Sequence, residues 1–338
     1  MAEMGTHGGT DALGIPAHDF STNRNACGPC PLAVDALQAA HSAQYPDPAY
    51  TALREQLAQF HGVEVRRMVI AGSASEFIHR ITAHALRQGA SCVSFPPHHY
   101  GDYPQAAQVW GLLEAGRRMG AGLHWACAPS SPLGQEDAVL AQWAVQPAVP
   151  GTWRVLDCAY APLRLEPAPD LPGLEQLWQL WTPNKALGMT GVRAAYAIAP
   201  VDVPAQELAA LRLLAPSWVV GVHGVAMLQA WTQPEVQQWL QASLQQLRHW
   251  KAQQLALCAR LGWQVLLGHQ ANYFVVRWPE HLQARMPQRL AALRAQGIKL
   301  RDATSFGLPG CVRLGVLPPA SQQALEQAWQ ALSDKESV

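Results

Sequence analysis

Short apolar runs alternate with stretches of helical spacing between residues 68 and 198, and this alternation restricts the fold more than any other feature. Each run has the length and composition of a β-strand, and apolar residues recur at helical spacing between runs. The runs cover residues 68–71, 91–95, 153–157 and 194–198. Alternating units of this size build a mostly parallel sheet with helices on both faces, so the sequence predicts an α/β fold.

The flanking segments differ in composition and indicate three parts. Residues 1–44 are rich in Gly, Pro and Asn, which favours an extended arm. Residues 204–260 are helix-rich, and strand-like and helical runs alternate in the last third of the chain. We predict an arm over 1–44 that packs with the small domain or a partner subunit, a large domain over 45–240 and a small α+β domain over 241–338.

Composition argues against several classes of protein. The chain carries 24 Lys plus Arg and 24 Asp plus Glu, so its formal net charge is zero, and we expect no nucleic-acid surface. No stretch of about 18 apolar residues is free of charges and Pro/Gly breaks, so we expect no membrane span. The N-terminus lacks the pattern of a signal peptide, and the seven cysteines follow no disulfide-framework spacing. These features predict a cytoplasmic location.

Lys185 lies in a segment that suits cofactor chemistry. Residues 181–193 read Trp-Thr-Pro-Asn-Lys-Ala-Leu-Gly-Met-Thr-Gly-Val-Arg, so that Thr182 precedes the lysine and Arg193 follows a Gly-containing turn. A lone lysine is usually a solvated surface charge, but this chain has only four lysines. The setting of Lys185 in such a turn therefore favours a functional interpretation.

An acidic and a phenolic residue precede this segment. The strand-like run 153–157 ends on Asp157, and Tyr160 follows three residues later. Pyridoxal 5'-phosphate needs an amine for its Schiff base, an anion for its pyridine nitrogen, and cationic and hydroxyl groups for its phosphate. An aspartate at a strand end also caps turns, so it is the grouping with Lys185 that favours this cofactor.

Two other motifs invite different chemistry. His98 and His99 are adjacent, but no matching Cys or His pair lies at ligand spacing, so we predict no metal. Residues 27–30 read Cys-Gly-Pro-Cys, which is the active-site sequence of thioredoxin. That chemistry requires the first cysteine at a helix N-terminus after a strand, whereas here an Asn-rich loop precedes it. Coincidence is the better interpretation.

The motifs resemble, in kind and order, those of fold-type I pyridoxal-phosphate enzymes, in the branch that holds histidinol-phosphate aminotransferase and L-threonine-O-3-phosphate decarboxylase. The resemblance runs from His7 to Leu332. His-Gly-Gly at 7–9 and Asp-Phe-Ser at 19–21 look like the opening of the decarboxylases, and Tyr-Pro-Asp-Pro at 45–48 is similar to both enzymes. It implies a large domain with a mostly parallel, seven-stranded type of sheet between helices, a small α+β C-terminal domain, and a homodimer with the active site at the interface.

The resemblance also implies roles for individual residues. Lys185, Asp157 and Tyr160 would form the catalytic group. The residues implied for binding pyridoxal 5'-phosphate are Ser73, Ala74, Ser75, Tyr100, Ser131, Asp157, Tyr160, Thr182, Lys185 and Arg193. Those implied for the substrate are Arg313, Arg301, Asn25 and Tyr45, the last reaching into the partner's active site. Without the resemblance, Ser73 or Ser75 would suit a plain helix cap and Arg313 a solvent-facing strand position.

Two departures from the family pattern affect the expected chemistry. Ser131 stands where the family has an asparagine that bonds the cofactor's phenolic oxygen, and Asn184 stands where it usually has a serine or another small residue. These departures leave open whether the activity is reduced, redirected to another reaction or lost. Beside the two enzymes of this branch, a non-catalytic binding protein with the same fold is therefore a third possibility.

The resemblance implies a small phosphorylated amine or amino acid as the substrate. The openings at 7–9 and 19–21, with Ser-Phe-Gly-Leu-Pro-Gly at 305–310, favour L-threonine-O-3-phosphate decarboxylase of cobalamin biosynthesis. Leu317 favours the alternative, histidinol-phosphate aminotransferase, because the decarboxylases often have a second arginine near that position.

Replacing Lys185 with Ala should abolish the visible absorbance of the bound cofactor and all turnover, because no other residue is placed to supply the amine. Borohydride reduction followed by peptide mapping of the wild-type protein checks the assignment independently. A reduced cofactor attached to Lys251, Lys299 or Lys335 would contradict it.

Overall fold

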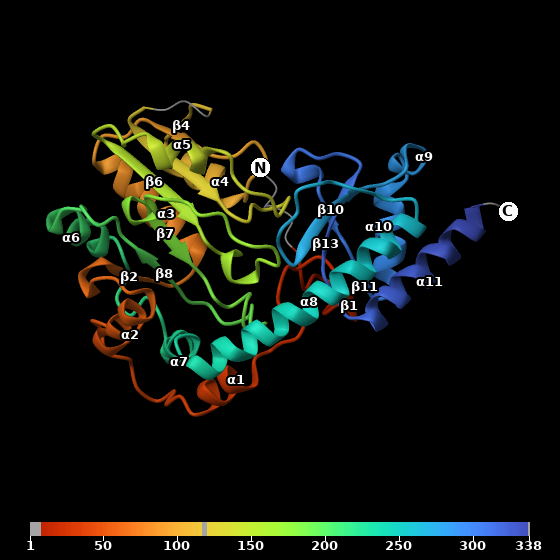
Figure 1. Cartoon of the computed structure of the whole chain (residues 1–338), viewed down its shortest axis with the longest axis horizontal. Helices are drawn as coiled ribbons and strands as arrows, with labels where there is room; N and C mark the ends of the chain where they lie inside the picture. The colour runs from red at the N-terminus through yellow and green to blue at the C-terminus, as the bar shows by residue number, and fades with distance from the viewer. Residues whose placement is uncertain (1–7, 117–119, 337–338) are drawn as a thin grey trace.

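The computed structural model describes residues 8–116 and 120–336 and contains a large and a small sheet connected by one long helix (Figure 1). The large sheet has seven strands in the order β2-β8-β7-β6-β5-β3-β4. These strands are β2 (Met68–Ala71), β3 (Cys92–Ser94), β4 (Leu113–Glu114), β5 (Gly122–Cys127), β6 (Thr152–Asp157), β7 (Trp178–Trp181) and β8 (Ala195–Ile198). Pairings from β7 to β4 are parallel, whereas β8 runs antiparallel to β2 and β7. The predicted α/β fold is confirmed.

Helices cover both faces of this sheet because successive side chains of a strand point to opposite sides. On β2, Val69 and Ala71 join a core with α3, α4 and α6, while Met68 and Ile70 join one with α1, α2 and α7. Helix α5 packs on β5 and β6 through a third cluster. These helices are α1 (Pro31–Gln38), α2 (Thr51–His61), α3 (Ala74–Arg87), α4 (Asp102–Trp110), α5 (Val139–Val145), α6 (Ala205–Leu213) and α7 (Val222–Trp231).

Helix α8 (Pro234–Arg260) connects the large sheet to the small one. Its 27 residues span about 40 Å. The small sheet has the order β12-β13-β10-β9, and Trp263, Trp278 and Trp329 pack together in its core. Its elements are β9 (Gln264–Val265), β10 (Tyr273–Arg277), β12 (Arg301–Asp302), β13 (Cys311–Gly315), α9 (Glu280–Gln283), α10 (Met286–Ala295) and α11 (Pro319–Glu336). We retain the domain division near residue 240 as a proposal.

The sequence patterns did not predict some of the strands and strand pairings. The arm forms β1 (His18–Asp19), which pairs in parallel with β11 (Ile298–Lys299), nearly the full chain length away. Strand β7 was not predicted; its Trp-Gln-Leu-Trp sequence is short and alternates between buried and half-buried positions. Among the helices of the described ranges, none has the length and apolar character needed to cross a membrane.

His61 ends α2 inside an aromatic cluster behind β7 and β8. Its Nε2 lies 2.8 Å from the Tyr196 hydroxyl, and its ring centroid lies 4.9 Å from that of Trp181. Burial lowers the pKa of the imidazole from 6.5 to about 4. The folded protein therefore holds His61 neutral where the unfolded chain would already be protonated.

Because the folded-state pKa is depressed, the stability linked to His61 is fully present above pH 6.5 and is lost as pH falls toward about 4. The loss over this window should reach about 3 kcal/mol, and His61→Phe should remove that part of the pH dependence. Urea unfolding across this range measures it. Equal pH slopes in the two proteins would show that His61 does not titrate in this way.

Candidate active site

A cavity of about 430 Å³ lies where the carboxyl ends of β5, β6 and β7 face the small sheet and the arm. Open α/β sheets bind ligands at this edge. Most residues that the sequence implied for the site line the cavity: Ala74, Ser75, Tyr100, Ser131, Asp157, Tyr160, Thr182, Lys185, Arg193, Arg301 and Arg313. Segments from the whole chain therefore meet at one place.

The turn that carries Lys185 is held from behind by the arm. The Asn25 backbone N–H donates to the Lys185 carbonyl at 2.8 Å, and its side-chain amide donates to Ala186 O at 3.0 Å and to the Ser243 hydroxyl at 2.7 Å. Gly28 packs so closely on Gly188 that a Cβ on Gly188 would lie 2.8 Å from the Gly28 Cα. On the cavity side, the Lys185 Nζ lies 5.2 Å from the centre of the Tyr160 ring.

Asp157 ends β6 as a buried carboxylate at the cavity wall. It is 4% exposed and accepts hydrogen bonds from the Tyr103 hydroxyl at 2.6 Å and the Ala159 N–H at 2.9 Å. Burial is the largest influence on its pKa and raises it, while the bond from Tyr103 and the charge of Lys185 oppose that rise. Both hydrogen-bond donors are neutral, so a cation such as a pyridinium in the cavity would stabilise the carboxylate further.

Tyr103 is a functional neighbour that the sequence analysis did not single out. Its ring stacks on Trp125 with centroids 4.5 Å apart, which directs its hydroxyl toward Asp157. The sequence feature that could have identified Tyr103 is its position three residues after Tyr100, in the first turn of α4.

The N-terminus of α3, Thr182 and Arg193 line one corner of the cavity. Ser73 caps the helix by accepting the Glu76 N–H at 3.0 Å, and it does not line the cavity, whereas Ala74 and Ser75 do. Arg193 is exposed at the cavity and forms no hydrogen bond or ion pair within residues 8–116 and 120–336. A free guanidinium beside helix N–H groups suits a phosphate.

Asn184, at the position where the resemblance implies a smaller residue, stabilises this corner. Its Oδ1 accepts the Thr182 hydroxyl at 2.8 Å, and its Nδ2 donates to Val192 O at 3.3 Å. Asn184 thereby joins the two ends of the lysine turn, and both polar atoms of its amide are occupied.

Two arginines from the small sheet also line the cavity. Arg301 on β12 is the register partner of Arg313 on β13, and the Phe306 ring lies 4.7 Å and 5.6 Å from their guanidinium carbons. Arg313 donates to Ser21 O at 2.9 Å and to the Ser131 hydroxyl at 3.4 Å. Burial, and secondly the charge of Arg313, lowers the pKa of Arg301 to about 10. Neighbouring cations in a partly buried cavity favour an anionic ligand.

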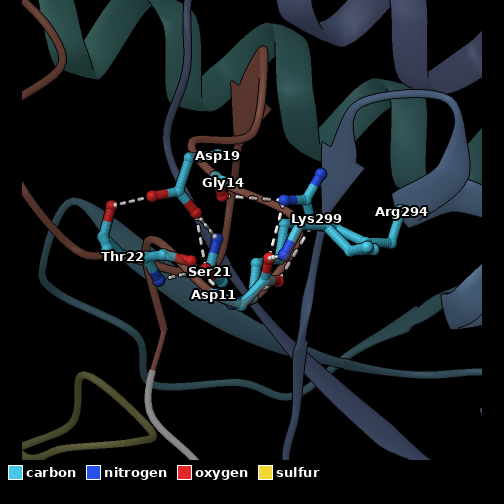
Figure 2. Close-up of polar contacts among 9 residues, drawn as sticks. Asp11, Gly14, Asp19, Ser21, Thr22, Arg294 and Lys299 are labelled. Carbon is cyan, nitrogen blue, oxygen red and sulfur yellow. Dashed lines mark hydrogen bonds and ion pairs between the residues drawn. The ribbon is translucent and has the colours of Figure 1, made fainter.

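Ion pairs tie the arm to α10 and β11 (Figure 2). Asp11 accepts two hydrogen bonds from Arg294, at 2.9 and 2.7 Å, and lies 2.9 Å from the Lys299 Nζ. Further along the arm, Asp19 accepts from the Ser21 N–H and the Thr22 hydroxyl. The arm is thus shaped so that residues 21–23 line the cavity, a contribution that the sequence analysis missed.

Some implied residues lie elsewhere. Asn25 does not line the cavity, because its amide is used behind the lysine turn; the expected substrate contact is corrected to a supporting one. Tyr45 is 77% exposed and stacks on Trp218 with centroids 4.4 Å apart, outside this cavity. His7 lies outside the described residues.

The histidine pair at 98–99 and the Cys-Gly-Pro-Cys motif at 27–30 are both hydrogen-bonded to other parts of the chain. His98 and His99 bond different carbonyls, Phe306 O and Pro96 O, and the part of the chain that the structure describes holds no cluster of three metal-ligating side chains. Cys27 and Cys30 are free thiols, and the Cys30 N–H donates to Leu187 O of the lysine turn.

Comparison with known proteins agrees with this geometry. The model of the class I and II aminotransferase family matches residues 125–332, and the chain belongs to that family. It is accordingly a pyridoxal-phosphate-dependent enzyme of the aminotransferase type. Histidinol-phosphate aminotransferase from Roseiflexus castenholzii is 28% identical, with 93% of this chain and 90% of that protein covered.

Solved structures share the fold. Histidinol-phosphate aminotransferase from Sinorhizobium meliloti, in complex with pyridoxal-5'-phosphate, has a TM-score of 0.75 at 20% identity and covers 92% of this chain and 90% of its own. L-Threonine-O-3-phosphate decarboxylase from Porphyromonas gingivalis has a TM-score of 0.70 at 19% identity, covering 90% and 94%. The predicted family, fold and cofactor are thereby confirmed.

Asp11→Asn should loosen the arm, because a neutral amide cannot hold both Arg294 and Lys299. The two cations depress the pKa of Asp11, so its contribution is present above about pH 4 and is lost as pH falls below that value. Hydrogen exchange should accelerate at the Gly9 and Gly14 amides in the variant. Asp170→Asn, an exposed substitution, is the control, and unchanged exchange in Asp11→Asn would show that the ion pairs do not fasten the arm.

Proposed function

We propose that the enzyme acts on a small amine that carries a phosphate, and that decarboxylation of L-threonine O-3-phosphate is its reaction. The observation that supports this proposal is the Arg301–Arg313 pair, which lines the same cavity as Arg193 and the α3 N-terminus. Two adjacent guanidinium groups favour a ligand with more than one negative charge. A phosphomonoester that also carries a carboxylate has two anionic groups, and arginine can bind either group in a bidentate manner.

The cofactor end of the cavity has the parts that pyridoxal 5'-phosphate requires. We assign Lys185 as the amine that holds it, Asp157 as the anion at its pyridine nitrogen and Tyr160 as a donor to its ring oxygen. Ala74, Ser75, Thr182 and Arg193 surround the position for its phosphate, and Tyr100 is the stacking residue. When bound, the cofactor withdraws electrons from the bond that breaks at the substrate's α-carbon.

The chain's own groups then direct the reaction. The Lys185 Nζ is the group that can move a proton at the α-carbon, since it lines the same cavity as both arginines. Arg313 and Arg301 orient the substrate's anions, and this orientation selects which α-bond is cleaved. The Phe306 ring packs beside both guanidinium groups within the same cavity.

Histidinol-phosphate transamination is the second candidate, because relatives with that name match over most of the chain. Histidinol phosphate also carries a phosphate, and the oxo-acid partner of a transamination carries carboxylates. We further propose a cytoplasmic homodimer in which the exposed Tyr45, supported by Trp218, reaches the partner's cavity. A non-catalytic binding role is the third candidate.

A substrate panel separates the candidates. The protein reconstituted with pyridoxal 5'-phosphate is mixed with L-threonine O-3-phosphate, with histidinol phosphate plus 2-oxoglutarate, and with unphosphorylated amino acids, and carbon dioxide and oxo product are measured. Carbon dioxide from the first mixture supports the decarboxylase. Glutamate formation from the second alone would replace it with the transaminase, and turnover of neither would leave the binding role.

Arg313→Lys should raise KM for the phosphorylated substrate and leave cofactor occupancy intact, because an ammonium cannot form two parallel hydrogen bonds to an oxyanion. The expected loss is about 1.5–3 kcal/mol, or roughly ten- to a hundredfold in kcat/KM. Arg277→Lys, on the exposed end of neighbouring strand β10, is the matched control. Unchanged kinetics for Arg313→Lys would place the anion elsewhere, with Arg301 or the partner's Tyr45 as the next candidates.

A further inference from the structure

The arm brings a carboxamide against the hydroxyl of Tyr160. Asn23 is 4% exposed and lines the cavity, and its Nδ2 donates to the Tyr160 hydroxyl at 3.2 Å. Its Oδ1 is buried and has no hydrogen-bond partner within the described ranges of the chain. One end of this amide therefore contacts a cavity side chain, while the other is a buried acceptor without a partner among the described residues.

The backbone around Asn23 is fixed from the small domain. The Asn272 side chain donates to Asn23 O and to Arg24 O, at 3.1 Å each, and the Asn272 carbonyl accepts the Val316 N–H at 2.8 Å. These bonds attach the arm to the chain segments at the ends of β10 and β13. The position of the Asn23 amide is consequently set by the fold and not by a free loop.

The other groups that could take this role are already used. Asn184 is the second carboxamide among the described cavity-lining residues, and both of its polar atoms are bonded within the lysine turn. The Ser131 hydroxyl accepts from Arg313 and forms no hydrogen bond with Tyr160 in the described part of the structure. Asn23 is thus the cavity amide with a free acceptor and a direct bond to Tyr160.

We propose that Asn23 is a positioning residue that directs the Tyr160 hydroxyl proton into the cavity and presents its own Oδ1 to a ligand N–H or O–H. A phenol has one O–H to donate, and its oxygen accepts from other donors. Because the Asn23 amide donates to that oxygen, the Tyr160 proton is left to point away from Asn23, into the cavity that Tyr160 lines. The inference rests on cofactor binding and not on the phosphorylated substrate.

The test measures the absorbance of the protein reconstituted with pyridoxal 5'-phosphate as a function of pH, without substrate. A donor aimed at the cofactor's ring oxygen favours the form with more negative charge there. Losing the alignment of Tyr160 should therefore raise the pH midpoint of the titration. Asn23→Ala should raise it by about one unit, a tenfold change in the proton equilibrium.

Asn23→Asp tests the direction of the hydrogen bond with almost no change of shape. An ionised carboxylate only accepts, so it would turn the Tyr160 proton away from the cavity, and the midpoint should rise as in Asn23→Ala. If the Asp variant titrates like wild type while the Ala variant shifts, the amide lies the other way round and the proposal is overturned. Unchanged midpoints in both variants overturn it as well.

Two further variants separate positioning from general damage. Arg24→Ala alters the adjacent arm residue, which does not line the cavity, and should leave the midpoint unchanged. A midpoint that rises equally in Arg24→Ala would assign the effect to the arm as a whole and overturn the proposal. Ser131→Asn added to Asn23→Ala places an amide on another wall of the same cavity and should return most of the shift.

The titration and the substrate panel fail independently. If the panel finds no phosphorylated substrate, the midpoints still test Asn23, because the titration contains no substrate. If the midpoints do not move, the panel result stands.

Discussion

The buried carboxylate of Asp157 is the constraint on which the rest of the site depends. A charge at the end of a central strand is costly unless its surroundings are polar and fixed, and here Tyr103, the Ala159 amide and Lys185 surround it. Stacking on Trp125 holds Tyr103, so the support extends into the core between the sheet and α4. In the role that we propose for Asp157, a cationic cofactor ring would add a further stabilising charge at this depth.

The arm carries three functions within a few residues. Asn25 supports the lysine turn from behind, Asn23 faces the cavity in front of it, and the carbonyl of Ser21 holds Arg313. Side-chain bonds of Asp11 and Asp19 fasten the arm, together with the two-residue pairing of β1 with β11. Separate arm residues thus contact the lysine turn, Tyr160 and Arg313.

Most of the fold could be predicted because strand and helix periodicity is local. The apolar runs that end at Ala71, Asp157 and Ile198 form strands at nearly the expected bounds. Strand β7 was not predicted, because its four residues, two of them half-buried in the structure, are too few to show a clear alternation of apolar and polar residues. The reversed direction of β8 depends on how the lysine turn returns the chain to the sheet, and no local pattern encodes that path.

By itself, the sequence determined the class of site, because a lysine in a Gly-containing turn, a strand-end aspartate and a nearby tyrosine are recognisable by type and order. Tertiary structure decided which groups share the cavity. Asn25 points away from the cavity, Asn23 lines it, and Tyr103 bonds Asp157 from the core. Asn184 is bonded within its own turn, and Arg301 pairs with Arg313. The physical reason is that the direction of a side chain in a loop depends on hydrogen bonds to partners far away in the chain, and residue type alone does not specify those partners.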